Sequence, residues 1–585
     1  MGYGKQSRVR DIFSDPAARS VAVRYVPALD CSPALEHMGF LQFSAVVQHA
    51  TGAAPADQDT LEAMWDELAR LDGAPRAQAD APYLEPASGY EPDSVRPGSA
   101  RVAVAGDREQ WGITELVIDG PSHGNPYVDV ELAARFTDEE GNGIGVGGFY
   151  DGAGVYRIRF SAPRAGTWTY VTTSNARSLD GLRGTFAAGP PGPGNHGPVG
   201  VADRFHFAYR DGTRFVPAGT TCYAWTHQPQ ALQERTLATL AAAPFRKLRM
   251  CLFPKSYLFN TNEPDRYPFV CGADGEWDFT RFDPEFFRHL ERRIDQLTGL
   301  GIETDLILFH PYDRWGFSEM PPAADDRYLR YLVRRLSAHR AVWWSLANEY
   351  DLMPWKSATD WERVAGVIRE NDHVGHLTSI HNCFALFDHG RPWITHCSIQ
   401  RTDVYRTAEN TTEWRAAYGK PVVIDECGYE GDIDQGWGNL SGPELVRRCW
   451  EGAVRGGYVG HGETYLNERE ELWWSKGGEL AGDAPRRIGF LLEITDAAPG
   501  GVLEPLPGDW DVPWGGAEDY RIAYFGFCRP RFRDITTPPG TRWHVDVIDT
   551  WNMTVDRQAG TYEGCFRVGL PGREFMAVRL IRADG

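Results

Sequence analysis

The spacing of apolar and polar side chains changes along the chain, and each region predicts a different kind of structure. Over residues 1–75 the spacing is helical. The apolar side chains that share one face of the clearest helix are Leu61, Met64, Leu68 and Leu71. Residues 76–99 are rich in Ala, Pro, Gly and Asp and show no period, which is typical of a linker. The first region therefore predicts a helical segment tethered to the remainder.

Residues 100–195 alternate apolar and polar side chains with a period of two. The alternating runs, separated by clusters of Gly, Asp, Asn and Pro, are 112–119, 128–136, 155–160 and 167–173. Short alternating strands joined by turns are typical of an antiparallel β-sandwich. The alternation returns over residues 519–585, which predicts a small C-terminal β-domain.

Residues 203–500 alternate nearly all-apolar runs with amphipathic helices, which begin at signals such as Asp283-Pro284 and the capping box at Ser441. The strand candidates are 214–219, 246–253, 303–309, 342–347, 376–381, 394–399, 421–425 and 456–461. Eight strand–helix units predict a (β/α)8 TIM barrel. A doubly wound open sheet is the alternative, but no Gly-rich nucleotide loop follows the first strand. The fold class is therefore multidomain α/β.

Two carboxylates stand at the C-terminal ends of barrel strands, where the chemistry of such barrels lies. Glu349 follows the fourth strand and Glu426 ends the seventh, so the two can face each other across the barrel. Cleavage of a glycosidic bond needs one carboxyl group to protonate the leaving oxygen and another to attack the anomeric carbon or activate water. Either Glu alone could be a salt-bridged structural residue. The pair at these positions favours catalysis.

Other side chains at the same strand ends could bind sugar hydroxyls or stack on a sugar ring. The candidates for substrate binding are Trp225, His227, His310, Asp313, His381, His396, Glu463 and Trp473. Core packing or ion pairing is the alternative for each of them.

Sequence motifs around the two carboxylates resemble those of known enzymes. Residues 344–349 (Trp-Ser-Leu-Ala-Asn-Glu) and 423–426 (Val-Ile-Asp-Glu) are similar to the strand-four and strand-seven motifs of clan A retaining glycoside hydrolases. More closely, the runs that resemble bacterial apiosidase-like glycoside hydrolases are 148–156, 166–170, 194–198 and 219–227. That family combines an N-terminal β-sandwich, a barrel and a C-terminal β-domain. The resemblance covers residues 100 to 585 and leaves residues 1–75 outside.

The resemblance implies a role for four residues. Glu349 would be the acid/base and Glu426 the nucleophile. Asn348 would hydrogen-bond the hydroxyl next to the anomeric centre, and Arg249 would support the nucleophile. Tyr350 stands where clan members often carry Pro, so the loop after Glu349 departs from the family pattern.

Composition narrows the possible partners. Lys and Arg total 60 against 80 Asp and Glu, a net charge of −20 that would repel nucleic acid. No apolar run is long enough for a bilayer, and the N-terminus lacks the apolar run of a signal peptide, so no membrane partner is expected. The 10 cysteines are scattered without a C-x-x-C pair. They predict buried free thiols rather than zinc ligands and favour a cytoplasmic location.

A cytoplasmic hydrolase needs a substrate small enough to be imported. We therefore expect a small oligosaccharide or a plant-type glycoside as the substrate, and no cofactor. Long aromatic-rich loops after strands two, three and eight further predict a pocket closed at one end, and hence an exo-acting enzyme. For residues 1–75 the sequence indicates only packing or contacts between copies in a homo-oligomer.

Two other readings use the same barrel. A metal-dependent sugar isomerase or hydrolase would take its ligands from His310, His381, His396, Glu349, Asp425 and Glu426. Against it, strand one carries no His-x-His and no Glu-x-x-His spacing occurs at these positions. A non-catalytic carbohydrate-binding barrel would be expected to have lost the catalytic pair, and both carboxylates are present.

Overall fold

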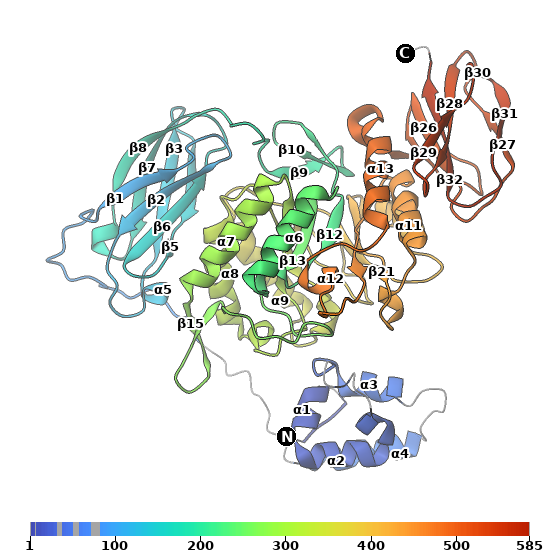
Figure 1. The fold of residues 1–585 in the computed structure, drawn as a ribbon. Helices are drawn as coiled ribbons and strands as arrows, with labels where there is room; N and C mark the ends of the chain where they lie inside the picture. The colour runs from blue at the N-terminus through green and yellow to red at the C-terminus, as the bar shows by residue number, and fades with distance from the viewer. Residues whose placement is uncertain are drawn as a thin grey trace.

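The computed structural model describes residues 2–5, 7–31, 35, 38–50, 58–71 and 82–583. A β-sandwich and a second β-domain flank a central barrel, and a helical segment lies below the barrel (Figure 1). The predicted fold class, a multidomain α/β chain built around a TIM barrel, is confirmed. None of the described helices is long and apolar enough to cross a bilayer.

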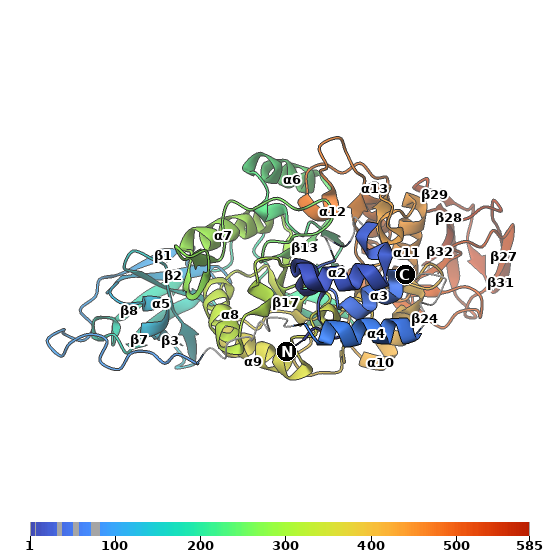
Figure 2. The same ribbon diagram turned by 90° about the horizontal axis from the view of Figure 1, so that it is seen from below.

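The N-terminal helical segment has a small core of its own. Its helices are α1 (Val9–Ser14), α2 (Pro16–Tyr25), η1 (Pro27–Cys31), α3 (Phe43–Ala50) and α4 (Gln58–Ala69). Met64 and Leu68 of the predicted amphipathic helix are fully buried. Residues 72–81, which include the start of the predicted linker, lie outside the described residues, and residues 82–99 form only turns and bends. Seen from below, the segment lies in front of the barrel (Figure 2).

Two four-stranded antiparallel sheets form the β-sandwich, in the orders β1-β2-β6-β5 and β4-β3-β7-β8. The elements are β1 (Val102–Gly106), β2 (Ile113–Asp119), α5 (Pro126–Asp129), β3 (Leu132–Asp138), β4 (Gly143–Gly147), β5 (Phe149–Tyr150), β6 (Val155–Ser161), β7 (Gly166–Ser174), η3 (Arg177–Leu179) and β8 (Arg183–Ala188). Alternation turns every second side chain inward. Phe136 and Phe160 stack there with ring centroids 4.3 Å apart.

Eight parallel strands close into the barrel. They are β12 (Gly219–Thr221), β13 (Lys247–Cys251), β16 (Glu303–Phe309), β17 (Val342–Ala347), β18 (Thr378–Ser379), β19 (Cys397–Gln400), β20 (Val422–Glu426) and β22 (Tyr458–Val459). Hydrogen bonds join the first five strands in the order β12-β13-β16-β17-β18 and the last three in the order β19-β20-β22. Parallel bridges between His381 and Ser398 and between Thr220 and His461 close the ring.

The first barrel strand does not lie where the sequence predicted it. Residues 214–215 belong to β11 (Arg214–Phe215), which pairs with β10 (His206–Tyr209) and β9 (Val199–Ala202) in a small antiparallel sheet. The barrel strand β12 begins at Gly219, where the prediction ended. Pro217 explains the break, because it cannot donate a ladder hydrogen bond.

Helices and short strands connect the barrel strands. The helices are η4 (Trp225–His227), α6 (Gln230–Ala242), α7 (Pro284–Gly299), η5 (Phe317–Glu319), α8 (Pro322–Leu336), η6 (Tyr350–Leu352), α9 (Ala358–Asn371), η7 (Ala408–Asn410), α10 (Thr411–Tyr418), η8 (Gly436–Gly438), α11 (Gly442–Val454), α12 (Trp473–Lys476), α13 (Ala484–Asp496) and η9 (Pro499–Gly501). The short strands are β14 (Phe269–Cys271), β15 (Trp277–Phe282), β21 (Glu430–Gly431) and β23 (Glu463–Thr464). Both predicted helix starts are capped: Asp283 accepts from the Glu285 N–H at 2.9 Å and Ser441 from the Glu444 N–H at 3.4 Å.

Antiparallel strands build the C-terminal domain. They are β24 (Glu504–Leu506), β25 (Trp514–Ala517), β26 (Tyr520–Tyr524), β27 (Phe532–Thr536), β28 (Arg542–Asp549), β29 (Thr554–Arg557), β30 (Tyr562–Glu563), β31 (Cys565–Gly569) and β32 (Met576–Arg582). β27 and β31 form a separate pair facing the larger sheet. Tyr520 ties the domain to the barrel by donating its hydroxyl hydrogen to the Ile494 carbonyl at 2.5 Å.

Buried ion pairs fix the β-sandwich to the barrel. Arg335 of α8 is fully buried, and it pairs with Glu291 of α7 and with Asp151 of the sandwich, each at 2.7 Å. Arg159 of β6 reaches the same Glu291 oxygen at 2.7 Å. Because a buried charge without a partner is costly, these contacts hold the two units in one arrangement.

The cysteines described with their side chains are free thiols. Five of them are buried, namely Cys222, Cys251, Cys397, Cys427 and Cys449. The expectation of buried thiols is met for these five, whereas Cys271, Cys528 and Cys565 are exposed.

Candidate active site

Glu349 and Glu426 meet at the C-terminal end of the barrel. Glu349 follows β17, Glu426 ends β20, and their exposed fractions are only 5% and 7%. With its amide nitrogen turned toward the pair, Gln400 donates to Glu349 Oε1 at 3.2 Å and to Glu426 Oε2 at 3.0 Å. The two oxygens can be no further apart than these two distances together. One amide nitrogen therefore lies between the two carboxyl groups.

The backbone at Glu349 is left-handed, with φ 53° and ψ 55°. A residue with a β-carbon adopts this conformation only where its surroundings enforce it. The Tyr350 N–H donates to the His381 carbonyl at 3.0 Å. A proline at position 350 would lack that N–H, so the departure from the family pattern ties the Glu349 turn to the neighbouring strand.

Glu426 is surrounded by donors. Tyr223, just after β12, donates its hydroxyl hydrogen to Oε1, and His381 Nε2 lies 3.4 Å from the same oxygen. Burial alone would raise the pKa of Glu426. The contacts with His381 and Tyr223 and the nearby charge of Arg249 lower it below the usual range instead. Glu426 is therefore stabilised as the carboxylate.

The His381 ring is held in place from its other side. Its Nδ1 lies 3.0 Å from Ser398 Oγ, and Ser398 donates its hydroxyl hydrogen to Asp425 at 2.6 Å. Ser398 thus joins the His381 ring to the buried Asp425 carboxylate. Nε2 is thereby turned toward Glu426.

Glu349 has the opposite electrostatic environment. Burial and the negative charge of Glu426 raise its pKa, and the hydrogen bond from the Tyr312 hydroxyl opposes this only in part. Of the two carboxyls, Glu349 therefore has the higher pKa.

Arg249 organises the floor of the site but does not touch the nucleophile candidate directly. Its guanidinium donates to Asp305 at 3.2 Å, to Ser345 at 3.1 Å and to Asn348 Oδ1 at 3.1 Å. Among the described residues no ion pair joins Arg249 to Glu426, so the expected support of Glu426 is through charge only. Lys247 completes the floor with ion pairs to Asp305 at 2.8 Å and Asp425 at 2.5 Å.

An aromatic wall surrounds a buried lysine beside the pair. The Lys255 ammonium lies 4.2 Å from the Tyr223 ring centroid, 4.3 Å from Tyr312 and 4.5 Å from Trp474. Tyr257 stands next to Tyr312 with ring centroids 4.6 Å apart. These aromatic residues and Gln400 were not among the predicted site residues. Tyr223, Tyr312 and Gln400 could have been found, because all three stand at or just after strand ends.

For three predicted binding residues, the structure places the side chain in the core. Trp225 is fully buried and donates to Met250 Sδ at 3.0 Å. Trp473 is buried and donates to Thr220 at 2.9 Å, whereas its neighbour Trp474 lines the site. His396 precedes β19 and so lies at the opposite end of that strand, where its ring packs 5.2 Å from Trp343.

Two predicted histidines are also buried away from the carboxyl pair. His227 packs on Phe286 and lines a separate small pocket with Gln233 and His289, so it does not reach the pair. Burial lowers its pKa to about 4. His310 bonds the Phe253 carbonyl at 3.2 Å, and burial and the Lys255 charge lower its pKa to about 3. It supports the wall rather than the substrate.

The two predicted hydroxyl-binding carboxylates hold loops instead. Asp313 accepts from the backbone N–H groups of Trp315 and Ser318 at 2.8 and 2.5 Å. Glu463 accepts from those of Ala481 and Gly482 at 2.6 and 2.9 Å. Both carboxylates thus hold the backbone of the loop that they face. Of the histidines and acidic residues predicted for the binding site, only His381 reaches the pair.

The ligand set proposed for a metal enzyme does not assemble. Within the described part of the chain, one group of possible ligands is compact, formed by Glu430, His461 and Glu463 with atoms within 4.8 Å. Glu430 accepts from the Ala484 N–H at 2.9 Å, so this group caps the start of α13. It shares no residue with the predicted set.

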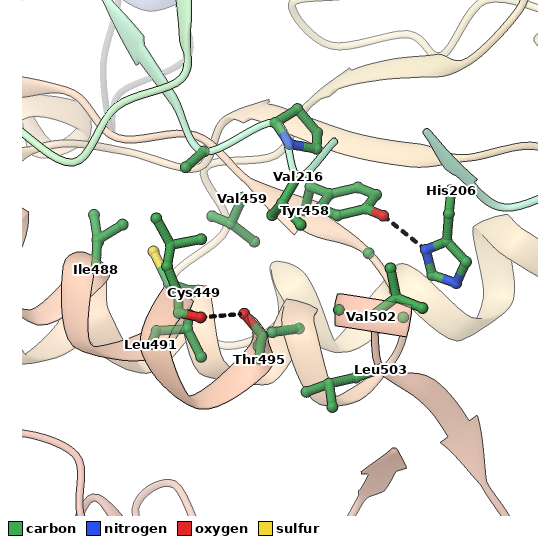
Figure 3. A pocket seen from close by; sticks show the side chains of 17 residues that line it. His206, Val216, Cys449, Tyr458, Val459, Ile488, Leu491, Thr495, Val502 and Leu503 are labelled. Carbon is green, nitrogen blue, oxygen red and sulfur yellow. Dashed lines mark hydrogen bonds between the residues drawn. The ribbon is translucent and has the colours of Figure 1, made fainter. Parts of the chain in front are cut away.

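Another pocket opens at the opposite end of the barrel from the carboxyl pair (Figure 3). Its walls come from residues before β12 and β22 and from α11 and α13, and its 17 lining residues include no carboxylate. His206 and Tyr458 in its wall bond each other at 2.6 Å. This pocket is apolar and lacks the groups that glycoside cleavage needs.

Comparisons with known proteins agree with this site. Residues 202–477 match the family model "Apiosidase-like, catalytic domain", and residues 107–175 and 510–581 match two domains of unknown function, DUF5060 and DUF5605. A "putative glycoside hydrolase" from Bacteroides vulgatus is 39% identical, with a TM-score of 0.77 over 81% of this chain and 99% of its own. A glycoside hydrolase family 5 structure from the same species is 14% identical, with a TM-score of 0.52 over 67% of this chain and 95% of its own, and shares the fold. Comparison with curated proteins gives no match.

Proposed function

The chain belongs to the apiosidase-like glycoside hydrolases, and we propose that it cleaves glycosides with retention of anomeric configuration. In this proposal Glu426 is the nucleophile and Glu349 the acid/base. The observation that carries it is the contrast between two buried glutamates that share the Gln400 amide. One has its pKa lowered by donors and the other has its pKa raised by burial. A retaining mechanism needs both states at the same pH.

The proposed reaction proceeds in two displacements. The Glu426 carboxylate attacks the anomeric carbon while Glu349 gives its proton to the leaving oxygen, so a glycosyl ester forms and the leaving group departs as an alcohol. Glu349, now ionised, then takes a proton from water. The water oxygen attacks the anomeric carbon, the ester bond to Glu426 breaks, and both carboxyl groups return to their first state.

Asn348 is proposed to bind the hydroxyl next to the anomeric centre. Its amide oxygen accepts from Arg249 at 3.1 Å, which fixes the amide and leaves the nitrogen as the donor toward a substrate. The Lys255 ammonium, which makes no hydrogen bond or ion pair with another described residue, is available for a second ring hydroxyl. Trp474 offers the face of an indole to the sugar ring.

The proposed substrate is a small glycoside that enters with its non-reducing end first. A closed pocket is proposed because both glutamates are largely covered, at 5% and 7% exposed, and two of the contacts that cover them are aromatic side chains, Tyr223 and Tyr312. The sugar itself is to be identified by experiment.

A panel of aryl glycosides tests the proposal, with α and β anomers of pyranoses and furanoses. The first-formed product anomer is read by NMR. We expect turnover of at least one member, with a product of the same configuration as the substrate. A product of inverted configuration would contradict the retaining mechanism. Release of internal fragments from a long oligosaccharide would contradict the exo mode.

A further inference from the structure

The N-terminal helical segment is attached to the mouth of the barrel. Arg8 and Arg10 both pair with Glu319, and Arg10 also donates to the Asp313 carbonyl at 3.3 Å. The Arg8 guanidinium lies 4.0 Å above the Trp355 ring. These barrel residues stand in the loops after β16 and β17, at the same end as Glu349 and Glu426. Figure 2 shows the segment in front of this end of the barrel.

Phe40 is the part of the segment that comes closest to the catalytic pair through described contacts. Its ring meets the Tyr312 ring edge-on at 4.8 Å and the Tyr257 ring at 6.3 Å, and only 8% of the residue is exposed. Tyr312 donates its hydroxyl hydrogen to Glu349. Phe40 is thus separated from the proposed acid/base by one aromatic ring.

Phe40 lies on the Glu349 side of the carboxyl pair. Tyr312 touches Glu349, whereas Tyr223 and His381 touch Glu426. The general acid has to contact the oxygen of the leaving group, so the leaving group occupies the Glu349 side. Phe40 therefore stands beyond the leaving group and not beside the sugar that is attacked.

We propose that the N-terminal segment completes the leaving-group subsite and that Phe40 is its outer wall. This inference rests on the proposed function, because it uses Glu349 as the acid. A wall of aromatic rings from Phe40, Tyr257 and Tyr312 suits a leaving group of one ring with an apolar face. An aromatic aglycone and a single sugar both have that chemistry. Longer leaving groups would collide with the segment.

The segment lies outside the family matches, which begin at residue 107. The barrel, with the carboxyl pair, Tyr257 and Tyr312, lies within the family match over residues 202–477, whereas Phe40 lies outside the matched residues. Leaving-group selection is thus separable from the catalytic machinery and can be altered without touching it.

The test compares Phe40→Ala with Phe13→Ala. Phe13 belongs to the same segment but packs on Phe43 within it, so its removal is the matched control. For the glycoside found in the screen, kcat/KM is measured with a one-ring and a three-ring leaving group. Phe40→Ala is expected to change the ratio of the two by roughly three- to tenfold in favour of the larger group. Phe13→Ala should leave the ratio unchanged, and Phe40→Leu should lie between.

Binding of free 4-nitrophenol and of a free monosaccharide, measured by calorimetry, supplies an arm that does not depend on turnover. If Phe40→Ala binds either compound more weakly than wild type and Phe13→Ala do, the proposed wall is supported. The compound whose binding is weakened shows whether the wall accepts an aromatic aglycone or a sugar. An unchanged ratio of kcat/KM together with unchanged binding overturns it. If no glycoside is cleaved, the proposed function fails and the binding arm alone decides this inference. Thermal unfolding of Phe40→Leu alongside Phe40→Ala separates loss of the wall from loss of the segment's fold.

Discussion

Replacing Tyr312 and Tyr223 by Phe, one at a time, should move opposite limbs of the pH profile of kcat/KM. Tyr312 donates to Glu349 and Tyr223 donates to Glu426. A donated hydrogen bond stabilises the ionised carboxylate, so its removal raises the pKa of that carboxyl. Glu426 must be ionised, and its pKa sets the acid limb. Glu349 must be protonated, and its pKa sets the alkaline limb.

The size of each displacement follows from the hydrogen bond that is lost. A hydrogen bond to a charged group contributes about 1.5–3 kcal/mol, and about 1.36 kcal/mol corresponds to one pKa unit. Tyr312→Phe should therefore move the alkaline limb up by roughly one to two pH units. Tyr223→Phe should move the acid limb up by roughly one unit, because Glu426 keeps His381 and the nearby charge of Arg249. The two carboxyls interact, so the apparent values belong to the pair.

Each variant is the matched control for the other, since the same hydroxyl is removed beside a different carboxyl. The measurement is kcat/KM across the full profile on an activated aryl glycoside. Movement of the acid limb by Tyr312→Phe and of the alkaline limb by Tyr223→Phe would reverse the roles of the two glutamates. A uniform fall in rate at every pH, with neither limb moved, would refute the coupling of these hydroxyls to the catalytic carboxyls.

Further predictions concern the acid, the aromatic wall and the domain interface. Glu349→Ala should lose roughly 10²–10⁴-fold in rate on a substrate with a poor leaving group, but much less on an activated substrate, and azide should restore turnover. Glu426→Ala should be inactive on both substrates. An equal loss of rate by Glu349→Ala on the two substrates would contradict the assignment. Trp474→Ala should raise KM, whereas Trp473→Ala should lower the free energy of unfolding by about 3–5 kcal/mol with KM unchanged. If Trp473→Ala raised KM and Trp474→Ala lowered only the stability in urea, the placement of Trp474 in the site and Trp473 in the core would be refuted. Arg335→Met should lower the free energy of unfolding in urea by about 1.5–3 kcal/mol, because Glu291 and Asp151 each lose one charged hydrogen bond but keep Arg159 and Arg157. An unchanged midpoint would show that the Arg335 ion pairs contribute nothing.

The barrel could be predicted from the sequence because buried parallel strands are nearly all apolar. The run predicted at 303–309 is strand β16, and Glu426 was expected at the end of strand seven, where it lies. The first strand was misplaced because the run at 214–219 is also apolar, and periodicity alone does not tell a barrel strand from the small sheet that precedes it.

The direction of individual side chains could not be predicted to the same degree. His396 was expected at the mouth, but β19 begins one residue later, which puts His396 at the closed end and Gln400 at the mouth. Trp473 and Trp474 are adjacent, and the turn of α12 points one into the core and the other toward Lys255. The contact of Phe40 with the site could not be predicted from the sequence, because its partners Tyr257 and Tyr312 are far along the chain and no local pattern links them.

The division of labour between the two glutamates follows from the charge of the buried site as a whole. Three cations lie beneath and beside the pair, namely Lys247, Arg249 and Lys255. Three carboxylates other than Glu349 lie among them, namely Asp305, Asp425 and Glu426. These charges balance when Glu426 is ionised. A fourth ionised carboxyl would be an uncompensated charge in a site shielded from water, where such a charge costs several kcal/mol, about the scale of a buried ion without its partner. The proton therefore stays on Glu349 until the leaving oxygen takes it. The attack by Glu426 then neutralises one carboxylate as Glu349 becomes the other, so the total charge of the site is the same before and after the first displacement.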